Sequence, residues 1–206
     1  MAGTETDSQD VFFQQFQLND EQQHYLLRLA RQAIAHFLET GEILQPPATN
    51  DSQFRQKAGV FVTLRTRRGA GQPDDKAMRL RGCIGHVEAD VALLDLVPVM
   101  AVKAATEDPR FPPVTAVELP NLHIEISLLS PLEPVTDVAS IEIGVHGLVI
   151  ISGLRRGLLL PQVPLMFDWS REDYLAGICR KAGLPDDAWR YADLLTFTTQ
   201  VFEEAE

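Results

Sequence analysis

Residues 59–85 read GVFVTLRTRRGAGQPDDKAMRLRGCIG, and this stretch decides the fold class. Its first part, 59–66, alternates apolar and polar residues and is rich in β-branched side chains, which is typical of a strand with one buried face. A stretch rich in Gly, Pro and Asp follows at 68–75, and a second β-rich segment runs through 78–84. Two such segments around a turn-forming loop predict a β-hairpin.

The rest of the chain alternates between helical and strand patterns. Apolar spacing with capping residues predicts helices over 19–41, 90–107 and 170–183, and Pro98 predicts a kink or break in the second. Period-two alternation predicts a strand over 122–128, a hairpin over 144–160 and a terminal strand over 195–202. Because no βαβ unit repeats, we expect an α+β fold with mainly antiparallel sheets and packed helices.

Length and composition favour a compact protein. A chain of 206 residues with 45% hydrophobic residues is long enough to bury a core without disulfides or metals. We expect a flexible N-terminal tail at 1–15 and one domain at 16–206. No apolar run approaches the ~20 residues needed to span a bilayer. The polar, acidic N-terminus does not look like a secretory signal, so we expect a cytoplasmic protein.

Charge is distributed unevenly along the chain. There are 18 Lys and Arg residues against 29 Asp and Glu residues, a net charge of −11, which argues against a dedicated nucleic-acid-binding protein. The segment 55–81 nevertheless contains eight basic and only two acidic residues. This basic island predicts a surface that faces an anionic ligand, or else a solvated loop and hairpin.

Cys83 lies in the segment MRLRGCIG (78–85). On a strand, the period of two would place one set of side chains on a polar face and the other on an apolar face: Arg79, Arg81, Cys83 and Gly85 against Met78, Leu80, Gly82 and Ile84. Nearby positive charge favours the reactive thiolate, so we expect Arg81 to lower the pKa of Cys83. Gly82 and Gly85 would allow close approach of backbone or ligand. The alternative is a small buried cysteine at the end of a strand.

The cysteines indicate neither a disulfide framework nor a metal site. Cys83 and Cys179 are far apart in the sequence, and no Cys-x-x-Cys pair is present. Cys83 and His86 would supply only half of a zinc site, which needs about four ligands. Cys179 lies in an apolar helical stripe and is expected in the core. No Walker loop or dinucleotide fingerprint indicates a particular cofactor.

Four other side chains have types suited to binding or proton transfer. His146, between glycines, is a candidate general base or a hydrogen-bonded structural residue. Glu125 faces away from the apolar side of its strand and could accept a proton or pair with an arginine. Arg110, on a loop bracketed by prolines, could orient a carboxylate or phosphate, although packing at a tight corner explains the same prolines. Gln162 places an amide on a second proline-stiffened turn.

Several motifs, in this order, resemble those of the AMMECR domain family: LRGCIG (80–85), DPRFPPV (108–114), SLLSP (127–131), GVHG (144–147), LLPQVP (159–164) and WSREDYLAGICRKAGLP (169–185). The resemblance covers roughly residues 20–204. It is closer to the prokaryotic branch, protein A of the AmmeMemoRadiSam system. It implies an α+β fold of two intimate subdomains, one larger and one smaller, with LRGCIG near the cleft between them.

The same resemblance implies site residues and partners. The positions that match the family motifs are Leu80, Arg81, Gly82, Cys83, Ile84, Gly85, Asp108, Arg110, Phe111, Pro112, His146, Pro161 and Lys181. Prokaryotic members of the family are encoded beside a Memo-like protein and a radical-SAM protein, which implies a shared pathway.

Three functions follow as hypotheses. The first is a cysteine-dependent enzyme or pathway component acting on a small anionic substrate, with Cys83 as nucleophile and His146 or Glu125 moving the proton. The second is a non-catalytic module that binds a small anion or nucleotide. The third is an adaptor that docks the Memo-like and radical-SAM partners. The expected ligand-binding residues are Arg81, Gly82, Gly85, Arg110, Gln162 and Lys181. We expect no nucleic-acid or membrane partner.

Overall fold

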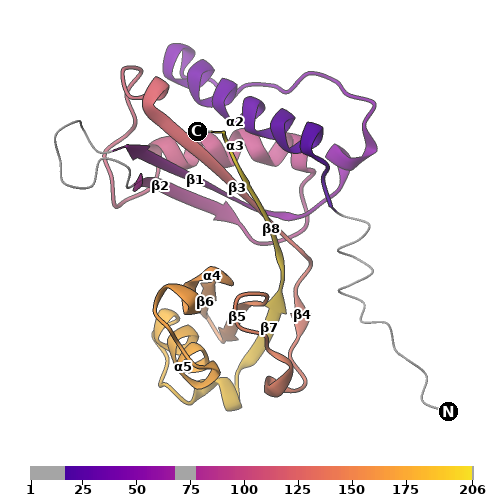
Figure 1. Ribbon diagram of the computed structural model, residues 1–206, viewed down its shortest axis with the longest axis vertical. Coiled ribbons are helices and arrows are strands. Elements are labelled where there is room, and N and C mark those ends of the chain that lie inside the picture. Colours follow the sequence, from indigo (N-terminus) through magenta and orange to yellow (C-terminus); the bar gives the residue numbers. More distant parts are fainter. Residues whose placement is uncertain (1–16, 68–77, 206) are drawn as a thin grey trace. The chain divides into compact units, whose positions relative to one another are not determined.

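The computed structural model describes residues 17–67 and 78–205. The chain divides into two compact units (Figure 1): unit 1 is Met1–Leu128 with Gln200–Glu206, and unit 2 is Leu129–Thr199. The predicted tail at 1–15 and the predicted loop at 68–75 lie outside the described residues. The expected cleft between two subdomains stays a prediction.

Unit 1 is built on a four-stranded antiparallel sheet with the strand order β2-β1-β3-β8. Its strands are β1 (Gly59–Arg67), β2 (Met78–His86), β3 (Leu122–Leu129) and β8 (Thr199–Glu203). Pairing of β1 with β2 is antiparallel, so the predicted hairpin is confirmed. The α+β class with mainly antiparallel sheets is confirmed as well.

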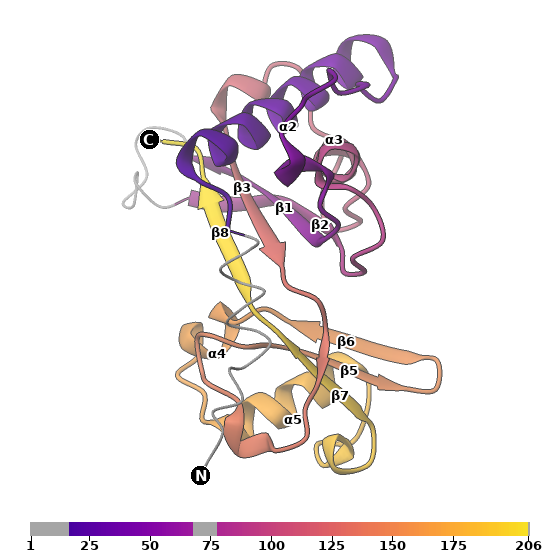
Figure 2. The same ribbon diagram turned by 90° about the vertical axis from the view of Figure 1, so that its right-hand side faces the viewer.

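Two helices, α2 (Asp20–Thr40) and α3 (Leu93–Thr106), cover one face of this sheet (Figures 1 and 2). The alternating residues Val60, Val62 and Leu64 of β1 are fully buried beneath them. We call this side of the sheet the helix face and the opposite side the helix-free face. Alternation therefore places Phe61, Thr63 and Arg65 on the helix-free face.

The first helix begins and ends as the sequence predicts. Asn19 and Gln22 form a reciprocal capping box, in which each side chain accepts the other residue's backbone N–H at 2.9 Å. Gly41, in the left-handed region with φ 78°, closes the helix and donates its N–H to Phe37. None of the described helices is both long and apolar enough to cross a membrane.

The second helix differs from expectation at two points. It begins at Leu93 rather than after Asp90, because the Asp90 carboxylate pairs with His86 at 2.6 Å and the Leu93 N–H donates to the Gln56 carbonyl. Pro98 lies inside the helix, which continues without a break to Thr106. The proline ring is buried in the core, so packing offsets the lost backbone hydrogen bond.

Unit 2 has a second four-stranded antiparallel sheet, with the order β4-β7-β5-β6. Its strands are β4 (Glu133–Pro134), β5 (Gly147–Ser152), β6 (Arg155–Leu159) and β7 (Asp193–Phe197). Its helices are α4 (Gln162–Met166) and α5 (Arg171–Lys181). Short 3-10 turns complete the two units: η1 (Ser52–Arg55), η2 (Leu119–Asn121), η3 (Val138–Ser140) and η4 (Ala188–Arg190).

The core of unit 2 lies between α5 and its sheet (Figure 2). Ile178 and Cys179 of α5 are fully buried with Leu148 and Ile150 of β5, so the prediction that Cys179 belongs to the core is confirmed. Tyr174 is also fully buried, and its hydroxyl lies within hydrogen-bond distance of three backbone carbonyls. Burial of its ring raises the pKa of Tyr174 well above the usual range.

The predicted terminal strand at 195–202 is two strands in different sheets. β7 ends at Phe197 and β8 begins at Thr199. Between them, Thr198 donates its N–H to the Ser130 hydroxyl and accepts the Ser130 N–H, both at 3.0 Å. A single residue bonded to a distant loop therefore moves the chain from one sheet to the other.

Candidate functional site

Cys83 lies on β2, an edge strand of the unit 1 sheet, directly opposite Thr63 of β1. Residues that face each other across antiparallel strands point to the same side, so Cys83 lies on the helix-free face with Thr63. The Thr63 hydroxyl donates a hydrogen bond to Cys83 Sγ at 3.3 Å. The half-buried thiol is therefore a hydrogen-bond acceptor in this structure.

The outer edge of β2 at Cys83 is closed by the loop that follows α3. The Cys83 N–H donates to Asp108 Oδ2 at 2.8 Å, and Arg110 Nη2 donates to the Cys83 carbonyl at 3.4 Å. Because both backbone groups point away from β1, Cys83 and Thr63 form the narrow type of pair in which side chains approach closely. This geometry accounts for the contact between the hydroxyl and the thiol.

Asp108 and Arg110 form a tight ion pair beside the cysteine. Arg110 donates to Asp108 from Nε at 2.9 Å, from Nη2 at 2.7 Å and from its backbone N–H at 3.1 Å. These bonds, with the one from Cys83, hold the pKa of the buried Asp108 carboxyl well below its usual range. The same pairing raises the pKa of Arg110. We call Thr63, Cys83, Asp108 and Arg110 the Cys83 cluster.

The cluster does not activate the thiol. Burial is the largest influence and raises the pKa of Cys83, while the Thr63 hydrogen bond and the positive charge of Arg110 oppose it in part. The negative charges of Asp108 and Glu125 raise the pKa further. Cys83 is therefore a neutral thiol at pH 7.

The expectation that Arg81 lowers the pKa of Cys83 is wrong, because the Arg81 guanidinium is engaged elsewhere. It donates from Nε to Glu118 at 2.8 Å, from Nη1 to the Pro112 carbonyl at 2.9 Å and from Nη2 to the Pro113 carbonyl at 3.3 Å. Its side chain is only 11% exposed. Arg81 therefore anchors the loop after α3 to β2.

A β-bulge explains why Arg81 departs from the predicted face. Gly82 pairs with Leu64, but Arg65 pairs with Leu80, so Arg81 is an extra residue with no partner on β1. The bulge breaks the period of two, and Leu80 moves to the helix-free face. The predicted single polar face for 79–85 is therefore wrong on the N-terminal side of Gly82.

The glycines on either side of Cys83 meet packing requirements within unit 1. A Cβ at Gly82 would lie 2.1 Å from the Ala104 carbonyl oxygen of α3, so this glycine lets the helix approach the strand. A Cβ at Gly85 would fall on the Phe61 ring, at 2.3 Å. The groups that approach these glycines closely therefore belong to the protein itself: the backbone of α3 at Gly82 and the Phe61 ring at Gly85.

Glu125 lies on β3 and is mostly buried. Arg65 Nη2 approaches its carboxylate at 3.4 Å, which agrees with the predicted alternative of an arginine partner. Glu125 also influences the Cys83 thiol electrostatically. Glu125 therefore lies in unit 1, as do Cys83 and Arg110.

Comparison with known proteins identifies the family. The family model described as AMMECR1 matches residues 27–202. The chain belongs to the AMMECR1 family. A protein of Thermococcus gammatolerans is 41% identical over 196 residues, which cover 92% of this chain and 93% of that protein. Protein MK0488 of Methanopyrus kandleri is 44% identical over 196 residues, 90% of each chain.

A solved structure has the same fold. The crystal structure of the uncharacterized protein PH0010 from Pyrococcus horikoshii matches this chain with a TM-score of 0.81 at 40% sequence identity. The match covers 91% of this chain and 93% of that one. In the present AMMECR1-family chain, the LRGCIG and DPRFPP motifs meet at one place, the edge of β2, through the bonds of Asp108 and Arg110 to Cys83.

The candidate base His146 belongs to unit 2 and has a structural contact. The Nδ1 of its ring accepts the backbone N–H of Glu142 at 2.9 Å, and the backbone N–H of His146 donates to the Glu142 carbonyl at 3.0 Å. The imidazole therefore closes a turn before β5. Because Nδ1 is an acceptor, the neutral ring carries its proton on Nε2.

Gln162 and Lys181, the other predicted ligand-binding residues, also lie in unit 2. Gln162 is the first residue of α4, and Lys181 is the exposed last residue of α5. The predicted site residues thus fall into two groups. Cys83, Arg81, Gly82, Gly85, Arg110 and Glu125 are in unit 1, and His146, Gln162 and Lys181 are in unit 2.

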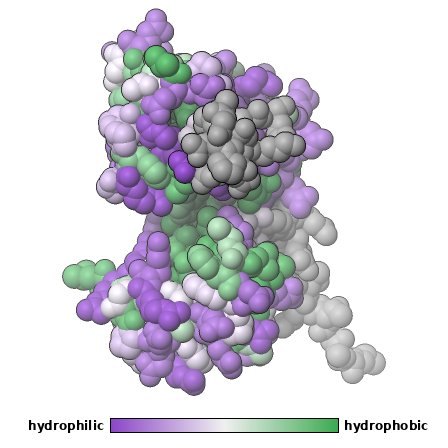
Figure 3. Space-filling view, turned by 60° about the vertical axis from the view of Figure 1, so that its left-hand side comes forward, coloured by the Kyte–Doolittle hydropathy of each residue, from purple (hydrophilic) through white to green (hydrophobic). Residues whose placement is uncertain are grey.

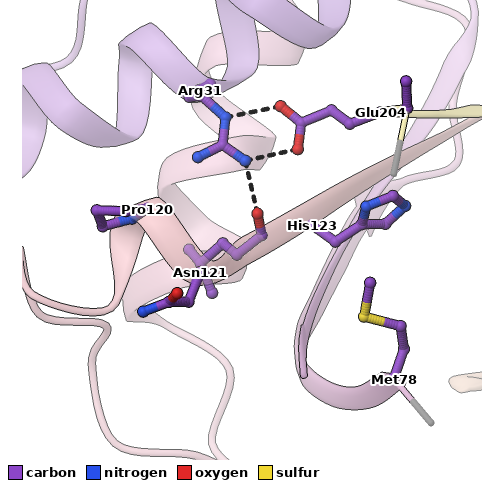
Figure 4. A pocket seen from close by; sticks show the side chains of 8 residues that line it. Arg31, Met78, Pro120, Asn121, His123 and Glu204 are labelled. Carbon is purple, nitrogen blue, oxygen red and sulfur yellow. Dashed lines mark hydrogen bonds and ion pairs between the residues drawn. The ribbon is translucent and has the colours of Figure 1, made fainter. Parts of the chain in front are cut away.

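A pocket on unit 1 lies beside Arg31 and His123 (Figure 4). Arg31 is fully engaged there, because it donates to both Glu204 carboxylate oxygens and to the Leu119 and Leu122 carbonyls. His123 contacts Glu203 at 3.1 Å. The Arg31 charge in this pocket is therefore already paired, and its hydrogen bonds tie α2 to the start of β3 and to the residue after β8.

Metal ligation finds no support among the residues described. No group of three or more His, Cys, Asp or Glu side chains lies close enough there to hold a metal ion. His86, the weak partner suggested for Cys83, contacts Asp90 at 2.6 Å and Glu88 at 3.8 Å.

Thr63 and Glu118 were not predicted from the sequence as parts of this arrangement. Thr63 is recognisable only from the register of the hairpin, which sets it opposite Cys83. Glu118 is separated from Arg81 by 37 positions, and no local pattern joins them. For Asp108, the Asp-Pro-Arg sequence placed an acid beside Arg110 but gave no sign of its bond to β2.

Proposed function

We propose that this AMMECR1-family protein binds a small anionic molecule at the Cys83 cluster, with Arg110 as the anion-binding group and Cys83 as a neutral contact. The proposal is supported above all by the position of Arg110, whose side chain is 54% exposed while being fixed by Asp108. A guanidinium held in one orientation binds a carboxylate or phosphate with little loss of side-chain entropy.

Arg110 and Arg81 differ in the hydrogen-bond donors that they can offer to a ligand. Among the contacts of the described residues, Arg110 uses Nε and Nη2 but leaves Nη1 without a partner. Arg81 uses all three of its nitrogens and is mostly buried. An anion that approaches the helix-free face beside Cys83 would therefore meet hydrogen-bond donors of Arg110 rather than of Arg81.

A binding role fits the thiol better than nucleophilic catalysis does. Nucleophilic attack requires the thiolate, and the burial that raises the pKa of Cys83 keeps it protonated near neutral pH. A neutral thiol that already accepts a hydrogen bond from Thr63 can still donate its S–H to an anionic oxygen.

The test is a titration of ¹⁵N-labelled protein with inorganic phosphate and, separately, with ATP. We expect saturable shifts at the Cys83 and Arg110 backbone amides. Arg110→Ala should weaken binding at least tenfold, whereas Arg79→Ala, which removes an exposed arginine from β2, the strand of Cys83, should change it less than twofold. Unaltered binding to Arg110→Ala, or shifts that do not localise to these residues with either anion, would reject the proposal.

A second candidate function is a Cys83-dependent enzyme or pathway component that acts with Memo-like and radical-SAM partners. It is favoured by the Thr63 hydroxyl, which hydrogen-bonds Sγ and would stabilise a thiolate once formed. Glu125, whose charge reaches the thiol, would be the proton acceptor. In an assay with both partners, Cys83→Ser should abolish activity and leave phosphate binding intact. Full activity of Cys83→Ser would exclude this candidate.

A further inference from the structure

Exposed apolar side chains are concentrated at the end of α4 in unit 2. Leu165, Met166 and Phe167 are consecutive and are 61%, 73% and 61% exposed. A run of three large apolar residues in contact with solvent is unusual on a soluble surface and marks interaction sites. Figure 3 shows hydrophobic surface gathered on the face of this unit that the view presents.

A neighbouring turn extends this surface. Gly144 lies against Leu165, since a Cβ built on the glycine would be 3.0 Å from Leu165 Cδ1. Val145, the next residue, is also exposed. We call Val145, Leu165, Met166 and Phe167 the α4 platform. It is formed by segments that adjoin the GVHG and LLPQVP motifs, to which the proposed anion site assigns no role.

The backbone of the platform and the ring of Phe167 are held in place. The Trp169 N–H donates to the Pro164 carbonyl at 2.9 Å, which closes the end of α4, and Asp168 adopts φ 52° in that turn. Asp168 is the one non-glycine residue of the described chain with positive φ. The Phe167 ring stacks on Trp169 with centroids 5.3 Å apart. A turn and a ring that are already held in place lose little conformational entropy when a partner binds.

Charge indicates the kind of partner. The segments that carry the platform also carry exposed acidic residues: Glu142, Asp168, Glu172 and Asp173. Arg171 is the single basic residue in 142–145 and 165–173. Neither Glu142 nor Asp168 forms an ion pair with a described residue. Acidic groups beside an apolar surface complement basic groups beside an apolar stripe.

We propose that the α4 platform docks a short amphipathic helical segment of another protein whose apolar stripe is flanked by Lys or Arg. Four side chains offer much less than the roughly 800 Å² per partner typical of stable protein–protein interfaces, so the occupant is a short segment rather than a second copy. The acidic groups would repel an anionic membrane surface. An amphipathic helix presents apolar side chains at i, i+3, i+4 and i+7 along one face, and these could pack on the platform.

The test measures binding of a fluorescent 18-residue Leu/Lys amphipathic peptide to the full chain by anisotropy. The double variant Met166→Ser/Phe167→Ser should weaken binding at least tenfold. Leu154→Ser, which alters a fully exposed apolar residue at the β5–β6 turn, should have no effect. Glu142→Gln/Asp168→Asn should weaken binding at least threefold, whereas Glu39→Gln/Glu42→Gln, an equal loss of charge on unit 1, should not.

Four results would overturn the proposal: no saturable binding of the Leu/Lys peptide, equal binding of a Leu/Glu peptide, binding unaltered by the platform variant, or binding of anionic vesicles in preference to the peptide. Because the platform lies in unit 2 and the Cys83 cluster in unit 1, each of these results leaves the anion-binding proposal as it was. The ¹⁵N–¹H spectrum of the platform variant, which should match that of the natural chain outside the platform, verifies that the fold of unit 2 is intact.

Discussion

The backbone N–H of Cys83 donates to the carboxylate of Asp108 at 2.8 Å, across 25 positions of sequence. An edge strand normally presents such a group to solvent or to another chain. In this protein a buried carboxylate takes it, and Arg110 completes the arrangement at the Cys83 carbonyl. The bond joins the LRGCIG motif (80–85) to the DPRFPPV motif (108–114) and fixes the edge of the sheet at the thiol.

Replacement of Asp108 by Asn should lower the free energy of unfolding by about 2 kcal/mol, because hydrogen bonds to a charged, buried acceptor are replaced by weaker neutral ones. Urea denaturation measures the change. The matched control is Asp186→Asn, since Asp186 makes only an exposed ion pair, with Arg180 at 3.6 Å, among the described residues and should contribute less than about 1 kcal/mol. Equal effects of the two variants would contradict the role given to Asp108.

Acid should destabilise unit 1 through Glu118 in a defined pH range. Hydrogen bonds from Arg81, and then from Thr115, lower the pKa of Glu118 to about 2. A depressed pKa in the folded state means that the carboxylate stabilises the fold fully above its unfolded pKa of about 4.3, and that this stabilisation is lost as the pH falls toward 2. Glu118→Gln should flatten the stability profile between these values, as measured by urea midpoints. A profile identical to that of the natural chain would refute this.

Cys83 should react slowly with iodoacetamide at neutral pH and become reactive only above the usual pH range for a cysteine, because burial raises its pKa. Thr63→Val should slow the reaction further, since the Thr63 hydrogen bond is the strongest influence that lowers this pKa. Mass spectrometry against pH gives both curves. Cys179 is fully buried and should be labelled only after denaturation, which provides an internal control. Rapid labelling of Cys83 at pH 7 would contradict this prediction and support the hypothesis that the thiol is activated.

Substitution of Ala for Gly82 should cost about 2–3 kcal/mol of stability, because its Cβ would lie 2.1 Å from the Ala104 carbonyl and α3 would have to move. Gly85→Ala should cost less, about 1 kcal/mol, since the Phe61 ring that it meets can rotate away. Comparison of urea midpoints separates the two. A larger loss in Gly85→Ala would show that the side-chain contact, not the backbone contact, limits the packing.

Arg31→Ala should loosen the C-terminal end of the chain. Arg31 holds Glu204, and Glu204 in turn accepts the Ile124 N–H at 2.9 Å, so exchange of the Ile124 amide with deuterium should accelerate at least tenfold. Arg28→Ala, on the exposed side of the same helix, is the control and should leave this exchange rate unchanged. If both variants behave alike, Arg31 does not hold the C-terminal segment.

Local signals in the sequence predicted the elements whose ends depend on nearby residues. The capping box at Asn19 and the glycine at Gly41 mark the first helix because both act within one turn. The start of α3 was predicted wrongly because Asp90, a suitable cap by type, pairs with His86. Such a competition is decided by tertiary contacts, which local spacing does not contain.

The candidate site was predicted only in part, for a similar reason. The sequence drew attention to Cys83 and Arg110, and the structure brings both into contact through one carbonyl. The role expected of Arg81 depended on unbroken alternation, which the bulge opposite Leu64 and Arg65 interrupts. A bulge is set by the partner strand and by the loop that draws Arg81 aside, and neither is visible in the spacing of LRGCIG.

The single-residue step at Thr198 has a consequence for the order in which the protein folds. The interior strand β7 of one sheet and the edge strand β8 of the other follow all the other described strands along the chain, so both sheets lack a strand until residues 193–203 have been synthesised. The nascent chain would expose the unpaired edges of β3 and β5 during that time, and such edges promote aggregation. Premature termination before β7 would therefore damage both units together, although almost all of each hydrophobic core would already have been made.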